Sequence, residues 1–343
     1  MYNLDTVLLA YQHDGVAEEE RFASQFGLRA SIIQETGKLP LLDGKLKSHL
    51  RTVQGRDTRI PAIVKGSISP VTTMSYNLEL NLPETDYSTV TLNTLMVSYG
   101  MYPEDWVNQH VSAEQIERNR IKECDEALAL AFEALVYTHY NTYKTQTWSG
   151  ANATLGFSFD TVSKNLVANW DAQSKSTMFS HIMTMAEYNN WSMGSMPIFV
   201  ANPLAGHLYN VVAQNGANNA VNLGVQPFPQ KFTSNRVSIT DGMGWSGFLL
   251  ESDSVGVAQN FTLPFQIAKQ VQGGKFGISD GVLPMLGMPV GVYAEEGVKA
   301  SSQNGNMSWV DKRAFIVSFF LLKKYNSAPT TTVTNILKID GII

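Results

Sequence analysis

The stretch SAEQIERNRIKECDEALALAFEALVYTHYNTY, residues 112–143, is predicted to form one continuous helix. Ser112 can accept a hydrogen bond from the amide of Gln115 while the Gln115 side chain reaches back, and this capping box marks a helix start. No Gly or Pro occurs from Ala113 to Tyr143, so nothing interrupts the helix over roughly 31 residues, or roughly 45 Å. We expect this helix, the spine helix, to brace the rest of the chain.

The two halves of the spine helix differ in composition. Residues 114–126 are densely charged, whereas residues 128–137 are apolar on most sides, as burial among other elements requires. We therefore expect the first half to face solvent and the second half to be buried. His139 lies in the apolar half, where a polar ring needs a hydrogen-bond partner, so it is expected to be a satisfied core residue.

Residues 58–100 have β character, and the clearest strand is 76–82 with companions at 63–69 and 88–97. A ribbon of two or three strands beside one helix is marginal alone and offers unpaired edges, so it should dock on a partner such as another subunit. Lys65, within the ribbon, could form an ion pair between subunits or protect an exposed edge. The side chains on the face that seeks burial are Tyr76, Leu78, Leu80 and Leu82.

The remaining segments predict a mixed α+β body. Residues 1–50 have few large apolar groups and are expected to form an arm. A strand at 196–201 leads to a helix at 204–212, with Asn202 as its cap and Pro203 at its first position, and then to a loop at 214–224. Further strands are expected at 236–240, 247–251, 257–263, 290–293, 314–322 and, by weak alternation, 330–339.

Composition excludes several classes of protein. With 343 residues and 44% hydrophobic content the chain can build a large core, and its net charge of −5 argues against a nucleic-acid binder with a basic stripe. Any contact with DNA is therefore expected to be loose. The lone Cys124 allows no intrachain disulfide. The longest apolar run, 314–322, is too short for a membrane helix.

Catalytic and cofactor motifs are weak. Gly242, Gly244 and Gly247 match a dinucleotide-binding pattern by letter, but a strand follows them where that motif needs a helix, so a hairpin turn is expected. The six histidines are scattered without metal-ligand spacing. Glu295 and Glu296 are the visible candidates for an acid pair, although a solvated turn explains them as well. We expect no enzyme, no metal and no cofactor.

The order of elements resembles the major capsid proteins of tailed bacteriophages with the Hong Kong 97-type fold. The features that carry this resemblance are the ribbon at 60–99, the spine helix, the strand and helix at 198–212, and the closing run from Trp309 to Leu322. The resemblance covers nearly the whole chain by element order, without one diagnostic motif.

The resemblance implies five parts: an N-terminal arm (1–50), an E-loop ribbon (51–111), a peripheral domain with the spine helix (112–200), an axial domain (201–310) and C-terminal strands that return to the peripheral domain (311–343). The arm and ribbon would lie across neighbouring subunits, and the loop at 214–224 is a candidate for the symmetry axis. Some members crosslink a ribbon Lys to a neighbour's Asn, but no acceptor is assigned here. The expected interface residues are Lys65, Tyr76, Leu78, Leu80, Leu82, Glu114 and Arg118.

The function implied is self-assembly of pentamers and hexamers into an icosahedral shell around double-stranded DNA. The expected partners are further copies of the chain, a separate scaffolding protein, a portal protein and DNA contacted non-specifically, but no membrane. The protein would be made in the host cytoplasm and reside in the virion. The alternatives are an encapsulin-type shell holding protein cargo, an α+β hydrolase with dispersed acidic residues, and a phage tail or receptor-binding protein.

Overall fold

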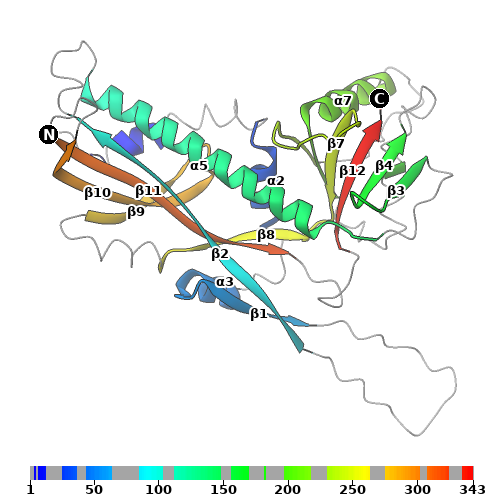
Figure 1. Ribbon diagram of the computed structural model, residues 1–343, viewed down its shortest axis with the longest axis horizontal. Coiled ribbons are helices and arrows are strands. Elements are labelled where there is room, and N and C mark those ends of the chain that lie inside the picture. The colour runs from blue at the N-terminus through cyan, green and yellow to red at the C-terminus, as the bar shows by residue number, and fades with distance from the viewer. Residues whose placement is uncertain are drawn as a thin grey trace, which may run out of the picture.

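The computed structural model describes residues 4, 7–12, 25–36, 44–63, 85–102, 112–147, 156–169, 181–182, 197–217, 230–262, 275–301, 307–323 and 334–342. These residues form two six-stranded sheets together with several helices, of which the longest crosses the first sheet (Figure 1). The predicted α+β class is confirmed.

The spine helix, α5, spans Ala113–Tyr143 as predicted. The capping box is present: the Gln115 amide donates to Ser112 Oγ at 3.3 Å, and the Ser112 amide donates to Gln115 Oε1 at 3.2 Å. The expectation that its first half faces solvent is wrong. Buried positions recur every three or four residues from Glu117 onward, so one face of the helix is buried along nearly its whole length.

The first sheet has the order β1-β2-β11-β10-β9, and β8 pairs with the end of β11 beyond β10. All its pairs are antiparallel. Helix α5 covers one face, where Phe132 packs edge-on against Phe319 with ring centroids 4.9 Å apart. The strands are β1 (Asp57–Ile63), β2 (Thr85–Met101), β8 (Val255–Asn260), β9 (Lys275–Leu283), β10 (Met288–Ser301) and β11 (Met307–Lys323).

The second sheet has the order β3-β4-β12-β7-β5-β6. Its central strand β12 pairs in parallel with β4 and antiparallel with β7. Gly341 in β12 lies against the buried Trp245 ring, so a Cβ at this position would clash with the indole. The strands are β3 (Phe157–Asp160), β4 (Asn165–Asn169), β5 (Ile198–Ala201), β6 (Gln230–Thr233), β7 (Trp245–Leu250) and β12 (Ile336–Ile342).

Helix α7, Pro203–Ala217, packs on the second sheet. The Ala205 amide donates to Asn202 Oδ1 at 3.1 Å, which confirms the predicted cap. The helix continues to Ala217, so the loop predicted from residue 214 begins later than expected.

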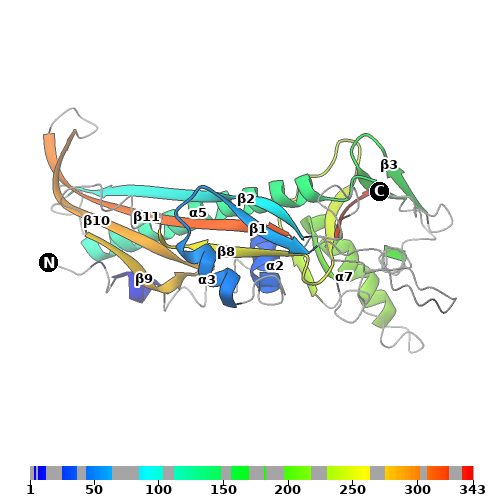
Figure 2. The ribbon, with the colours of Figure 1, turned by 90° about the horizontal axis from the view of Figure 1, so that it is seen from below.

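Part of the stretch predicted as an arm belongs to the core. Helix α2, Gly27–Thr36, places Leu28 and Ile32 in the main hydrophobic cluster beside α5 and β8. Helix α3, Gly44–Thr52, packs against the other face of the first sheet, because Leu50 contacts the cluster that contains Phe320. Figure 2 shows α3 and the second half of α5 on opposite sides of the sheet.

Other strand predictions had mixed outcomes. Those at 247–251, 290–293 and 314–322 coincide largely with β7, β10 and β11, whereas β9 was missed. Residues 236–240 are not a strand, since the Val237 amide turns back to the Ser234 carbonyl. The strand predicted at 257–263 ends at Asn260. The strand predicted at 76–82 lies outside the described residues.

The expected division at residues 200 and 310 does not follow the sheets. Strands β9 and β10 lie between these positions yet pair in the first sheet with β11. Strands β3 to β5, before residue 202, belong to the second sheet with β12. Segments far apart in the sequence therefore complete each sheet.

Candidate assembly surfaces

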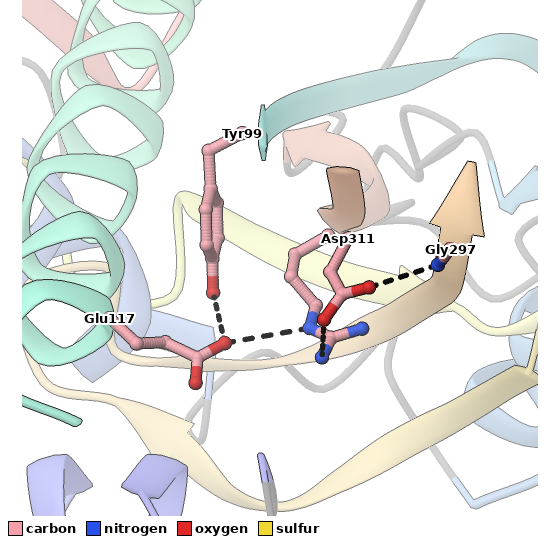
Figure 3. Close-up of polar contacts among 5 residues, drawn as sticks. Tyr99, Glu117, Gly297 and Asp311 are labelled. Atoms are coloured by element: carbon pink, nitrogen blue, oxygen red, sulfur yellow. Dashed lines mark hydrogen bonds and ion pairs between the residues drawn. The ribbon is translucent and has the colours of Figure 1, made fainter. Parts of the chain in front are cut away.

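The first buried carboxylate of α5, Glu117, ties the helix to the first sheet (Figure 3). Its Oε1 accepts hydrogen bonds from the Tyr99 hydroxyl of β2 at 3.3 Å and from Arg313 Nε of β11 at 3.4 Å. Burial, followed by the neighbouring Glu117 charge, raises the pKa of Tyr99, so the phenol stays protonated as the donor. Asp311 then accepts from the Gly297 amide at 3.0 Å in the β10 bulge. This chain of contacts fixes the end of the sheet that carries the bulge.

A second buried carboxylate, Asp125, holds two segments distant in sequence. It accepts from the Tyr11 hydroxyl at 3.0 Å, and from the amides of Met285 and Leu286, each at 2.9 Å. Burial raises its pKa to about 6, although these donors lower it. The helical turn at 7–12 and the turn between β9 and β10 are thereby fixed to the same side chain.

A third buried carboxylate, Glu133, joins α2 to the second sheet. It accepts from the Arg29 amide at 2.6 Å and from the Ser234 hydroxyl, which follows β6, at 2.7 Å. Burial raises the pKa of Glu133 to about 7, against the lowering effect of these two donors. Together the three carboxylates make α5 the element that positions both sheets.

His139 is buried as predicted, with Nε2 donating to the Leu322 carbonyl at 3.3 Å, and burial lowers its pKa to about 4. It borders an open groove of about 240 Å³ between the second half of α5 and strands β2 and β11. Lys323 lies at this groove, with Nζ 4.0 Å from the centroid of the Tyr143 ring. Among the described residues, none of those that line the groove is an Asp or a Glu.

The paired ends of β10 and β11 form an exposed extension. A register shift between Glu295 and Val298, with Gly297 at φ 66°, bends the pair, and Figure 2 shows it turning away from the line of the sheet. Trp309 on this extension is 58% exposed. Glu295 accepts from the Tyr293 hydroxyl at 3.0 Å and Glu296 is exposed, so this acidic pair lies on a solvated bend.

The predicted interface residues are only partly within the described chain. Glu114 and Arg118 are exposed in the first turns of α5. The ribbon residues Lys65, Tyr76, Leu78, Leu80 and Leu82 lie outside the described residues. Sequence reasoning missed the exposed Trp309 and Met96, which is 61% exposed on β2. Large apolar side chains at exposed strand positions carry no local signal, because burial depends on what covers the strand.

The glycines at 242, 244 and 247 form a turn and enter a strand, as predicted. Gly242 has a φ of 80°, the Met243 amide donates to the Thr240 carbonyl, and β7 starts at Trp245. Among the described residues there is no group of three or more side chains that could hold a metal ion. None of the described helices has the length and hydropathy needed to cross a membrane.

No protein-family model and no curated protein matches the chain. Solved structures do. A chain of the structure described as Mycobacterium phage Che8 matches with a TM-score of 0.49 and 10% identity, over 88% of this chain and 89% of that chain. The capsid structure of the cyanophage P-SCSP1u matches with a TM-score of 0.45 and 11% identity, over 85% of this chain and 85% of that chain. The capsid of a native GTA particle matches with a TM-score of 0.47 and 10% identity, over 86% of this chain and 89% of that chain.

The capsids of a cyanophage and of a GTA particle are thus among its structural neighbours. The likeness extends over most of each chain, and at these identities it concerns the course of the backbone. The roles of individual residues must come from the chain's own geometry.

Proposed function

We propose that this chain is the major capsid protein of a tailed phage, which self-assembles into an icosahedral shell around double-stranded DNA. One observation carries the proposal. Strands β1 and β2 continue as a two-stranded ribbon past the other elements on that side of the molecule (Figure 1), and residues 64–84 join its paired ends at Ile63 and Thr85. Such a ribbon is marginal alone and gains stability by docking on another copy.

The proposed parts follow the Hong Kong 97-type division, with boundaries adjusted to the strand pairing. Residues 1–50 contain the arm and 51–111 the E-loop ribbon. The peripheral domain comprises α5 and the first sheet, including β9 and β10. The axial domain comprises α7 and the second sheet, including β12. The bent extension with Trp309 and the exposed Glu114 and Arg118 would supply further contacts between subunits.

The proposed partners are further copies of the chain in pentamers and hexamers, a separate scaffolding protein, a portal protein and DNA. The virion is the proposed location. We expect no catalytic activity.

Assembly of the purified chain tests the proposal directly. We expect size-exclusion chromatography with light scattering and negative-stain electron microscopy to reveal rings, sheets or closed shells, alone or with a co-expressed scaffolding protein. A chain that remains monomeric under both conditions contradicts the proposal. Shells that enclose a protein cargo and no DNA would instead support the encapsulin alternative.

A further inference from the structure

Helix α3 presents a concentration of positive charge that its packing does not use. Its apolar residues Leu46 and Leu50 pack in a cluster with Ile60 and Phe320. The described stretch 44–59 contains five exposed cations and one exposed acid, Asp57. Asp57 already accepts a hydrogen bond from the Thr91 hydroxyl at 2.7 Å. This local excess stands against a net charge of −5 for the whole chain. The exposed cations are Lys45, Lys47, Arg51, Arg56 and Arg59.

The body of the molecule holds α3 in a fixed position. The buried Asn260 side chain donates to the carbonyls of Leu50 and Val53, each at 2.8 Å. The Phe261 amide donates to the Arg51 carbonyl at 3.2 Å. The bonds to Leu50 and Arg51 satisfy carbonyls that a helix C-terminus leaves without partners. The charged side chains therefore project from an anchored helix.

The side chains on the outer face of α3 indicate the kind of ligand. The exposed positions are Lys45, Lys47, Ser48, His49, Arg51 and Thr52, with no exposed apolar residue among them. Lysine, arginine and hydroxyl side chains are the groups that contact nucleic-acid phosphates. The centre of a protein interface is instead enriched in aromatic residues and depleted in lysine. The composition of this face therefore favours a phosphate backbone over an acidic protein.

We infer that the outer face of α3 binds the phosphate backbone of duplex DNA without regard to base sequence. This inference rests on the proposed function, which places DNA inside the shell, and it adds the surface that makes the contact. Lys45, Lys47 and Arg51 lie on this short helix, on the sheet face opposite α5, and Arg56 and Arg59 follow it in the chain. The rest of the acidic chain therefore need not attract DNA. The contact is weak and salt-dependent, because few phosphates are neutralised.

Binding of the purified chain to a short, fluorescently labelled DNA duplex, followed by anisotropy at several salt concentrations, tests this inference. We expect Lys47→Gln with Arg51→Gln to weaken binding about tenfold or more at low salt, and to reduce the slope of log affinity against log salt by roughly 2. The matched control, Arg236→Gln with Lys312→Gln, removes the same charge from two other exposed positions. It should change binding little.

Several outcomes overturn the inference. These are an equal loss of affinity in both double variants, no binding by the native chain, or affinity that differs between duplexes of different base composition. A face that binds no DNA but is required for self-association would be a contact between copies. Electron micrographs of the same variants keep the two proposals separate, since particles that assemble normally but lose DNA affinity support the α3 contact and leave the shell proposal intact.

Discussion

Three fully buried carboxylates, Glu117, Asp125 and Glu133, connect α5 to the rest of the molecule. Each accepts hydrogen bonds from a different set of segments, and the partners of Glu133 lie 104 and 101 residues away. Buried carboxylates are rare unless paired, so the dense charge of residues 114–126 predicts a solvent-exposed segment. The spacing of Glu117, Ile121 and Cys124 was the available signal, because it places Glu117 on the buried stripe. The identity of its partners depends on the fold.

Glu133→Gln is expected to remove a pH dependence of stability. The folded-state pKa of Glu133, about 7, lies above its ordinary value of 4.5. The folded state therefore binds the extra proton, and this group's contribution to stability is present below pH 4.5 and lost as pH rises through about 7. Glutamine does not titrate. Urea unfolding of the monomeric chain from pH 5.5 to 8 should show the free energy of unfolding of the variant rising relative to that of the native chain, by on the order of 2 kcal/mol.

The other buried groups do not confuse this comparison, because they are common to both proteins. The raised pKa of Asp125 also makes stability fall as pH rises. The lowered pKa of His139 makes stability rise with pH. Glu123→Gln on the exposed side of α5 is the matched control, and its stability should follow the pH profile of the native chain. If Glu133→Gln also follows that profile, Glu133 does not titrate in this range.

Elements with local start signals were predicted best. Helix α5 and the Asn202 cap of α7 rest on side chains within a few residues of the helix start. Strands depend on distant partners, and this is where prediction failed. Strand β9 was missed because its sequence, KFGISDGVL, contains two Gly and one Asp, which are depleted in strands. It forms through pairing with β10.

Ser112→Ala should destabilise α5 at its first turn. The variant loses the hydroxyl that accepts from the Gln115 amide, and loss of such a cap costs about 1 kcal/mol. Urea unfolding followed by circular dichroism measures the change. Thr138→Ala is the control, because the exposed Thr138 hydroxyl only returns to the Ala134 carbonyl within the same helix and Ala is the better helix former. Equal effects from both substitutions would show that the capping box contributes nothing.

In the whole molecule, each of the two sheets contains strands from both halves of the chain. The order of elements in the sequence predicted the α+β class and the position of the spine helix. It could not predict that β12 joins the second sheet while β9 and β10 join the first, because strand pairing is decided by packing across long separations. The partner that we propose for the β1–β2 ribbon, a second copy of the chain, likewise cannot be read from the order of elements.

Leu78→Asp with Leu80→Asp is expected to block assembly and leave the subunit folded. The alternation of apolar and polar residues at 76–82 gives this segment one face that seeks burial, and we propose that a neighbouring copy provides it. Sedimentation or size-exclusion chromatography should show monomers whose far-ultraviolet circular dichroism matches the native chain. Asn77→Asp with Asn81→Asp adds the same charges to the other face and should assemble normally. Loss of the fold in the leucine variant would mean that the segment is internal.

The central place of β12 has a consequence for how the chain folds. Residues 336–342 lie between β4 and β7, so the second sheet stays split into two parts until these residues have been synthesised. Pairing over such separations makes folding slow and leaves apolar surface exposed for longer. During this interval the edges of β4 and β7 are open to pairing with the same strand from another copy of the chain.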